Sequence, residues 1–324
     1  MSRSRPREHG WPPDPEPLPA GVVDNHTHLE SVLDVPVEDP GGVRTLADHL
    51  ARSAAAGVTR ILQIGCDLDA AAWTDRLLRT AGPGAPAALA VELLGGIAIH
   101  PNEAVLHAGV REVAPDGLEP SAAPRHDIGL DDAIAAIAAI ARGNARVRAI
   151  GETGLDHFRA GPRGRAVQVE AFRAHIALAK ELGLALQIHD RDAHDEVIEV
   201  LERDGAPERT VFHCFSGDAA MARYCTDRGW YLSFAGPVTF GSNVALREAL
   251  RVVPLSRLLV ETDAPYLTPH PFRGRPNAPY LLPHTVRRVA VELSLDAAGL
   301  AGLCRTLTAT AESLYGPWQT GRTG

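Results

Sequence analysis

The sequence is poor in cysteine and methionine and has no long hydrophobic run. Its four cysteines, in 324 residues, occur without CxxC spacing, which argues against a disulfide framework and favours reduced thiols. No apolar run reaches the roughly 20 residues that a membrane-spanning helix needs. The first 20 residues, MSRSRPREHGWPPDPEPLPA, lack the apolar stretch of a secretory signal. We therefore expect a cytoplasmic protein that does not act at a membrane.

The chain also lacks an excess of positive charge. Its 32 Lys and Arg residues against 40 Asp and Glu residues give a formal net charge of -8. This argues against broad adhesion to nucleic acid, so a polyanionic substrate would have to be held by a local basic group. We expect residues 1–20, rich in proline and charge, to form a flexible tail, residues 21–315 to form one domain, and residues 316–324 to form a C-terminal tail.

Within that domain, short apolar runs alternate with segments of helical periodicity. After a short apolar run at 21–23, we expect strands at 58–65, within 88–101, and at 147–152, 184–189, 210–215, 230–236 and 257–263. We expect helices at 43–57, 67–82, 131–143, 165–183, 192–205, 218–229 and 242–254, with two more within 280–292 and 295–314. The irregular stretch 102–129 is interpreted as a loop insertion. Eight strands alternating with helices favour an α/β fold with a single (β/α)8 TIM-type barrel, and a doubly wound open sheet is the alternative.

Six potential metal ligands stand at the ends of five of the apolar runs. They are His26, His28, Glu152, His189, His213 and Asp263. A barrel of this kind carries its chemistry at the carboxyl ends of its strands, so these side chains are expected to converge there. His26 and His28 are two residues apart and would point to the same face of a strand. Four imidazoles and two carboxylates suit Zn, Mn, Fe or Mg, so the sequence predicts a metal site at this end of the barrel.

The two carboxylates of this set have several possible roles. Glu152 would be costly to bury unless it binds metal or is paired, and it could either bridge two cations or form an ion pair with Arg148. Asp263 could hold a metal, accept a proton from bound water, do both, or simply cap the following loop. For His189 and His213 the alternative is a core histidine that is hydrogen-bonded to the backbone.

Four further residues are candidates for supporting roles. Arg273 and Arg275 follow the last strand, where a guanidinium could hold a phosphate or remain a solvated loop charge. His100 follows the third strand and could bind the leaving side of a substrate or hydrogen-bond to its own loop. Asp24 could orient an imidazole or cap the loop after the first strand.

Six motifs, in this order, resemble those of the TatD-type metal-dependent deoxyribonucleases, a family of the amidohydrolase-like superfamily. They are DNHTHL (24–29), AIHP (98–101), GETGLDHF (151–158), QIHDRDAHDE (187–196), HCFSG (213–217) and ETDAPYLTP (261–269). The resemblance covers about residues 21–315. It implies a barrel that binds two divalent cations, Mg, Mn or Zn, at the six ligands named above and hydrolyses the phosphodiester bonds of DNA. It also implies that Glu152 is the bridging ligand and Asp263 the water-activating base.

The most informative departure from the family pattern is at Ala278, and two functions compete with the nuclease. Ala278 stands where the family has a glutamate before a proline, which puts any role of that glutamate in doubt. The alternative enzyme is an amide or ester hydrolase of the same barrel superfamily that acts on a small molecule or an aminoacyl ester. The alternative outside the enzyme class is a noncatalytic binding protein, against which the intact ligand set argues. The sequence indicates no protein partner.

Overall fold

The strands of the protein form a closed (β/α)8 barrel. The computed structural model describes residues 10–37, 44–80, 89–118 and 120–318. Eight parallel strands follow one another in chain order around one sheet. They are β1 (Val22–Thr27), β2 (Val58–Gly65), β3 (Glu92–Ile97), β4 (Val147–Asp156), β5 (Ala185–Arg191), β6 (Thr210–Phe212), β7 (Tyr231–Phe234) and β8 (Leu258–Val260). Thr27 bridges Ala264 beyond β8, which joins the two ends of the sheet and excludes the doubly wound alternative.

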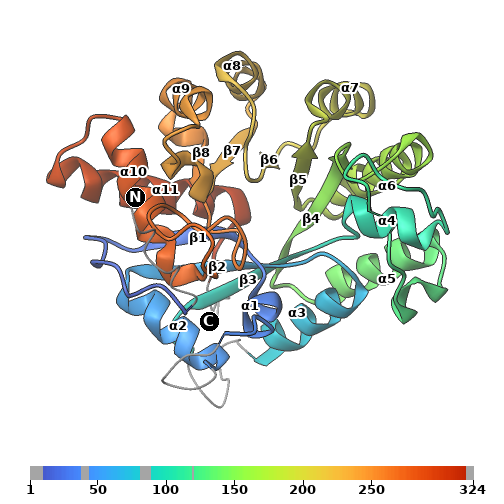
Figure 1. Ribbon diagram of the computed structural model, residues 1–324, viewed down its shortest axis with the longest axis horizontal. Coiled ribbons are helices and arrows are strands. Elements are labelled where there is room, and N and C mark those ends of the chain that lie inside the picture. The colour runs from blue at the N-terminus through green and yellow to red at the C-terminus, as the bar shows by residue number, and fades with distance from the viewer. Residues whose placement is uncertain (1–9, 38–43, 81–88, 119, 319–324) are drawn as a thin grey trace, which may run out of the picture.

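Helices surround the strands on the outside (Figure 1). They are α2 (Leu46–Ala55), α3 (Leu68–Thr80), α5 (Leu130–Gly143), α6 (Pro162–Leu182), α7 (His194–Asp204), α8 (Ala219–Asp227), α9 (Val244–Val252), α10 (Leu282–Glu292) and α11 (Ala297–Tyr315). Short 3-10 turns η2 (Gly236–Thr239), η3 (Leu255–Arg257) and η4 (Pro279–Leu281) lie between them. Across the described ranges, none of the helices has the length and hydrophobicity needed to cross a membrane.

The apolar side chains divide between two sides of the strands. One cluster lies between the strands and the surrounding helices and includes Ile61, Ile97 and Phe212. A second cluster is formed by side chains of the alternate strand positions, such as Val23 and Leu62. Because successive side chains of a strand point to opposite faces, both faces of every strand are apolar. A few buried polar residues, among them Asp24, Gln63 and Gln187, interrupt this apolar pattern within the strands.

The segment 102–129, expected to be a loop insertion, contains regular structure. It begins within α4 (Pro101–His107) and ends with the 3-10 turn η1 (Pro124–Asp127). The α4 helix packs against α6 at the edge of the ring (Figure 1). A further short helix, α1 (Leu29–Leu33), directly follows β1 and was not expected.

The N-terminal segment lies against the barrel from residue 10 onward. Trp11 is buried in a cluster with Tyr280 and Leu281, and the Tyr280 hydroxyl donates a hydrogen bond of 2.7 Å to the carbonyl of Pro12. Residues 10–20 are therefore packed rather than a flexible tail, whereas residues 1–9 lie outside the described residues. At the other end of the chain Trp318 is buried, and residues 319–324 are likewise outside them.

Candidate metal centre

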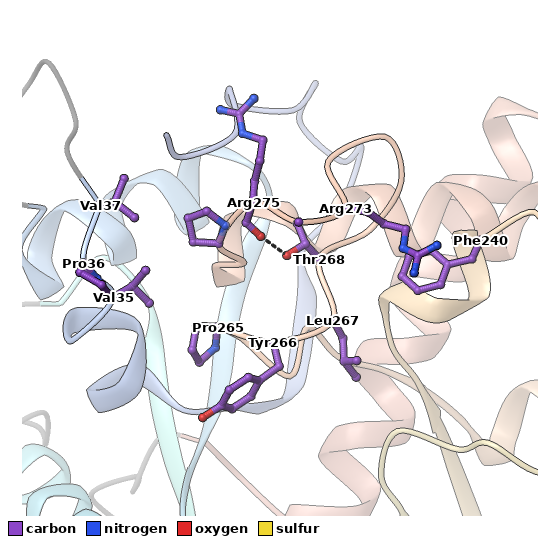
Figure 2. Close-up of a pocket in the computed structure, with 12 residues that line it drawn as sticks. Val35, Pro36, Val37, Phe240, Pro265, Tyr266, Leu267, Thr268, Arg273 and Arg275 are labelled. Atoms are coloured by element: carbon purple, nitrogen blue, oxygen red, sulfur yellow. Dashed lines mark hydrogen bonds between the residues drawn. The ribbon is translucent and has the colours of Figure 1, made fainter. Parts of the chain in front are cut away.

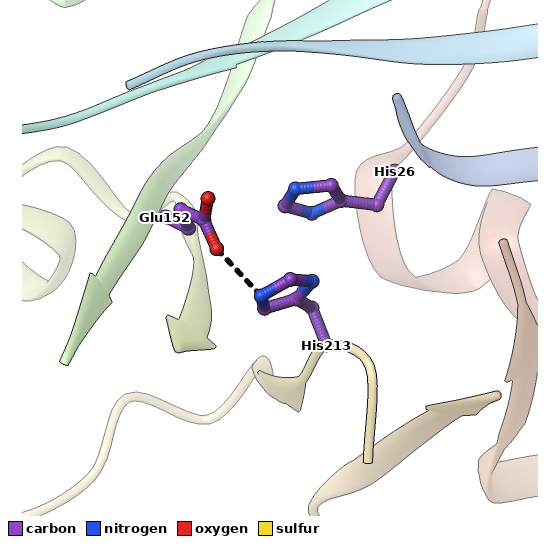
Figure 3. A group of neighbouring side chains, drawn as sticks. All are labelled: His26, Glu152 and His213. Atoms are coloured by element: carbon purple, nitrogen blue, oxygen red, sulfur yellow. Dashed lines mark ion pairs between the residues drawn. The ribbon is translucent and has the colours of Figure 1, made fainter. Parts of the chain in front are cut away.

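All six expected ligands meet at the carboxyl ends of the strands. Five of them, His26, His28, Glu152, His213 and Asp263, are buried, and His189 is partly exposed. The rings of His26 and His213 are stacked with 4.0 Å between their centroids. Figure 3 shows the Glu152 carboxylate pointing toward these two rings. Strands far apart in the sequence thus supply one compact group of nitrogen and oxygen donors.

Glu152 lies at the middle of this group. Its Oε2 atom is 2.5 Å from Nε2 of His213 and 3.2 Å from Nδ1 of His189. Its Oε1 atom is 3.8 Å from Nε2 of His28 and 3.8 Å from Nε2 of His100. Each oxygen of the carboxylate therefore faces a different pair of imidazoles.

A second carboxylate, that of Asp263, lies beside His26 of β1 and His28, which directly follows β1. The Nε2 atoms of His26 and His28 are 3.3 Å apart, and Oδ1 of Asp263 is 3.8 Å from the first and 3.4 Å from the second. Donor atoms of these three residues lie within 4.8 Å of one another, as do those of His26, Glu152 and His213. Imidazole nitrogens and carboxylate oxygens at this spacing fit a divalent metal ion.

The outer ring nitrogen of each imidazole has a partner of its own. Nδ1 of His26 is 2.6 Å from the Gln187 side-chain oxygen, and Nδ1 of His28 is 3.1 Å from the carbonyl of Ile64. Nδ1 of His213 is 3.3 Å from Glu261, and Nε2 of His189 is 3.3 Å from Asp156. Metal-binding histidines are commonly oriented in this way, because the outer partner fixes the ring and leaves the inner nitrogen for the ion.

None of these partners was expected from the sequence. Gln187 lies two residues before His189, and Glu261 lies two residues before Asp263. Residues two apart on a strand share a face, which is the signal that could have revealed both. Tyr315 of α11 extends the network, because its hydroxyl contacts Gln187 Nε2 and Asn25 Oδ1, each at 2.6 Å.

Cys66 also lies at the centre, although the sequence had suggested only a reduced thiol. Its sulfur is 3.2 Å from Oε1 of Glu152 and donates a hydrogen bond to it. Burial and the negative charge of Glu152 raise the pKa of the Cys66 thiol well above its usual value. The thiol therefore stays protonated, and it is a donor to the carboxylate.

The contacts of Glu152 and Asp24 exclude one alternative for each residue. In the described part of the chain the charged partners of Glu152 are imidazoles rather than Arg148. Asp24 accepts hydrogen bonds from the backbone nitrogen and the hydroxyl of Thr262, at 2.9 and 2.5 Å. Asp24 therefore ties β1 to the end of β8 and does not orient an imidazole.

Without metal, the site binds protons. Burial alone would lower the pKa of His28, but the hydrogen bond and charge of Asp263 raise it to about 9. Burial is likewise outweighed at His189, whose pKa is raised to about 9 by Asp156 and Glu152. Burial and the nearby His213 lower the pKa of His26 to about 3. Metal binding must therefore displace protons from some of these rings.

Of the three residues expected to contact the substrate, His100 and Arg273 lie near the metal centre or its cavity, and Arg275 is engaged elsewhere. His100 lies at the rim near Glu152, and its Nδ1 accepts a hydrogen bond of 3.1 Å from the backbone of Asn102, so it also caps α4. The Arg273 guanidinium lies 4.2 Å from the centre of the Phe240 ring. Arg275 points the other way and donates to the carbonyls of Gly10 and Trp11.

Beside the metal centre is a cavity of about 650 Å³ (Figure 2). Its walls come from residues 35–37, from the loop 265–268, from residues 273–276 and from Phe240. Tyr266 at its edge is 56% exposed, and its ring centroid is 6.0 Å from that of His28. Ala278, the position that departs from the family pattern, is fully buried, and so lies outside the cavity wall.

The barrel and its buried histidine and carboxylate centre define a metal-dependent hydrolase. Residues 23–316 match the family model described as TatD related DNase. The chain is 41% identical over 273 residues to an uncharacterized metal-dependent hydrolase, TatD, of Mycobacterium tuberculosis, which covers 83% of this chain and 89% of that protein. The chain therefore belongs to the TatD family.

Solved structures agree with this fold. The crystal structure of YjjV, a TatD homolog from Escherichia coli, has a TM-score of 0.70 at 23% identity and covers 91% of this chain and 98% of its own. A TatD family hydrolase from Entamoeba histolytica has a TM-score of 0.72 at 16% identity, covering 93% and 99%. At these identities the likeness concerns the fold alone.

Proposed function

We propose that the protein is a deoxyribonuclease that hydrolyses DNA phosphodiester bonds with water activated by two divalent cations. The observation that carries the proposal is the position of Glu152, whose two oxygens face different pairs of imidazoles. This placement supports a bridging carboxylate. One ion would be held on the side of His26, His28 and Asp263, and the other on the side of His189 and His213. Mg, Mn and Zn are the candidate ions.

When bound, such cations lower the pKa of water and stabilise the charge on the phosphoryl oxygens. Asp263 is the base that accepts the proton of the attacking water. The water oxygen bonds to phosphorus and the bond from phosphorus to one ester oxygen breaks. That oxygen takes a proton from a solvent water, and Asp263 later releases its own proton to solvent. Burial and the charge of His189 lower the pKa of His100 to about 4. His100 is therefore neutral near pH 7 and can orient the leaving side by hydrogen bonding.

The cavity beside the centre supports a nucleic acid substrate. The exposed ring of Tyr266 offers a surface on which a base can stack, and Arg273 offers a guanidinium for a phosphate. Because the net charge is -8, a strand would be held at this point and not along a broad basic surface. A short single-stranded end fits these requirements better than an extended duplex.

The test is hydrolysis of end-labelled single-stranded DNA by protein that has been stripped of metal and then given Mg²⁺, Mn²⁺ or Zn²⁺ separately. We expect at least one ion to restore cleavage, and Asp263→Asn to lower the rate by about 10² to 10⁴, the usual contribution of a general base. The matched control is Asp227→Asn, at an exposed carboxylate at the end of α8, which should cleave like the wild type.

Two outcomes would overturn the proposal. Cleavage that survives removal of all metal would place the activity outside this centre. If no ion restores cleavage of DNA but a small ester or amide is hydrolysed, the metal centre remains and the deoxyribonuclease assignment is wrong. RNA of the same sequence, assayed in parallel, decides between the two nucleic acids.

A further inference from the structure

A second group of metal-binding side chains lies on the segment between β3 and β4. Glu103 and His107 are four residues apart on α4 and so project from the same face of that helix. His126 belongs to η1 at the far end of the segment. One donor atom from each of the three residues lies within 4.8 Å of the other two. This group shares no residue with the catalytic centre.

We propose that Glu103, His107 and His126 bind one divalent transition-metal ion of the zinc class, apart from the catalytic ions. Two imidazoles and one carboxylate are a common donor set for zinc, with water as the fourth ligand. The ion would connect α4 to η1 and thereby hold the segment 101–128 in place beside α6.

His107 provides the first independent observation in favour of this ion. The residue is 5% exposed, and its Nδ1 is 3.0 Å from the carbonyl of Ile128, to which it donates. Its Nε2 is buried and has no hydrogen-bond partner among the residues that the structure describes. The ring therefore has the arrangement of a metal ligand, with one nitrogen fixed by a carbonyl and the lone pair of the other unused.

The contact between His126 and Glu103 resembles one in the catalytic centre. Nε2 of His126 is 2.8 Å from Oε2 of Glu103, as Nε2 of His213 is close to Glu152. An ion would replace the proton in this contact. That change requires the other tautomer of His126, because its Nδ1 now accepts a hydrogen bond from the backbone of Ala123. Ala123 is half-buried, so its backbone N–H can donate to a water molecule in place of His126.

The local charge also favours a cation. The Arg125 guanidinium is 2.7 Å from Glu103, 3.4 Å from Asp67 and 3.6 Å from Asp69. Three carboxylates around one guanidinium leave two formal negative charges, which a divalent ion would balance.

The experiment is zinc titration of the metal-stripped full-length protein, followed by calorimetry and by elemental analysis of the dialysed protein. It is run on the Glu152→Gln background, in which the catalytic centre is impaired, and on the otherwise unchanged chain. We expect His107→Ala to remove one equivalent of bound zinc in both backgrounds, together with part of the zinc-dependent rise in Tm. Glu103→Gln should also lose one equivalent of zinc. This second variant tests the inference even if His107→Ala fails to fold.

The matched control is His284→Ala. His284 lies on α10, and its Nε2 is also buried without a hydrogen-bond partner in the described part of the chain. It belongs to none of the clusters of three or more metal-binding side chains among those residues. This variant should keep every equivalent of zinc. If His107→Ala and Glu103→Gln both retain the zinc of the parent protein, the inference is wrong. If they lose one equivalent while DNA is not cleaved by any form, the inference stands and the proposed function falls.

Discussion

Oε2 of Glu152 lies 2.5 Å from Nε2 of His213, although β5 separates their strands in the sheet. The contact is possible because both side chains project inward from the rim at which the parallel strands end. A buried carboxylate in such a place is stabilised only by partners that carry or share positive charge. At Glu152, burial raises the pKa, but the imidazoles of His213 and His100 outweigh this and hold the pKa well below its usual value.

Replacing Glu152 by glutamine should therefore weaken metal binding and hydrolysis together. The amide keeps the size of the side chain but removes the negative charge between the imidazoles. We expect Glu152→Gln to lose bound metal and to cleave DNA at least ten times more slowly, as measured by elemental analysis and initial rates. Glu199→Gln, at an exposed position of α7, is the control. A variant with full metal content and full activity would rule out the bridging role.

Glu261 is a positioning residue, and its removal should act through the metal. Its Oε1 is 3.3 Å from Nδ1 of His213 and accepts a hydrogen bond of 2.6 Å from the backbone of Cys214. We expect Glu261→Gln to weaken metal affinity by about 10- to 100-fold, while kcat at saturating metal falls much less. Metal titrations of activity measure the two quantities separately. Equal affinity in variant and wild type would mean that Glu261 does not orient His213.

The two arginines after β8 should respond differently to substitution. Arg275→Ala removes hydrogen bonds to the carbonyls of Gly10 and Trp11, so we expect unfolding free energy to fall by about 1–3 kcal/mol with little change in KM. Arg273→Ala should instead raise KM for an oligonucleotide and leave stability nearly unchanged. Denaturant unfolding and steady-state kinetics on both variants give the comparison. The reverse pattern would assign phosphate contact to Arg275.

The stability of the metal-free protein should depend on pH through His175. Burial lowers the pKa of His175 to about 4, although the Ala171 carbonyl opposes the shift, and the unfolded-state value is about 6.5. Because the unfolded chain binds the proton first, stability is fully present above pH 6.5 and is lost as the pH falls toward 4. The slope approaches about 1.4 kcal/mol per pH unit.

His175→Gln is the variant that tests this dependence. We expect it to be less stable than the wild type at pH 7.5, and the difference to shrink by about 1–3 kcal/mol between pH 6.5 and 4.5. Urea unfolding at several pH values measures it. His270→Gln, at an exposed position, should show a constant difference from the wild type. A constant difference for His175→Gln as well would mean that its imidazole titrates normally in the folded protein.

The barrel and its six candidate ligands were accessible from the sequence because both follow from local pattern. Each of the eight strands lies in or overlaps an expected apolar run, and the ligands stand where the runs end, so one periodicity predicts both fold and site. That the six ligands would bind two ions was expected only from the resemblance of HCFSG and ETDAPYL to family motifs.

Other features depend on contacts between distant segments, which no local pattern reveals. Arg275 was expected to face a phosphate, but its guanidinium donates hydrogen bonds to the carbonyls of residues 10 and 11. The proline-rich segment that was expected to be a tail is therefore packed from residue 10 onward. The segment 102–129 looked irregular because α4 has only seven residues, too short for a clear helical period. Gln187 was part of a quoted motif, yet its role follows from the position of His26 on another strand.

The most direct test of the proposed deoxyribonuclease is a comparison of substrates on one preparation of metal-loaded protein. The kcat/KM for end-labelled single-stranded DNA is measured beside that for a small aryl ester and a small amide, with Asp263→Asn as the inactive reference. The proposed function predicts that DNA is the preferred substrate and that Asp263→Asn lowers every rate of hydrolysis by about 10² to 10⁴. Faster hydrolysis of the ester or amide, with DNA left intact, would contradict it.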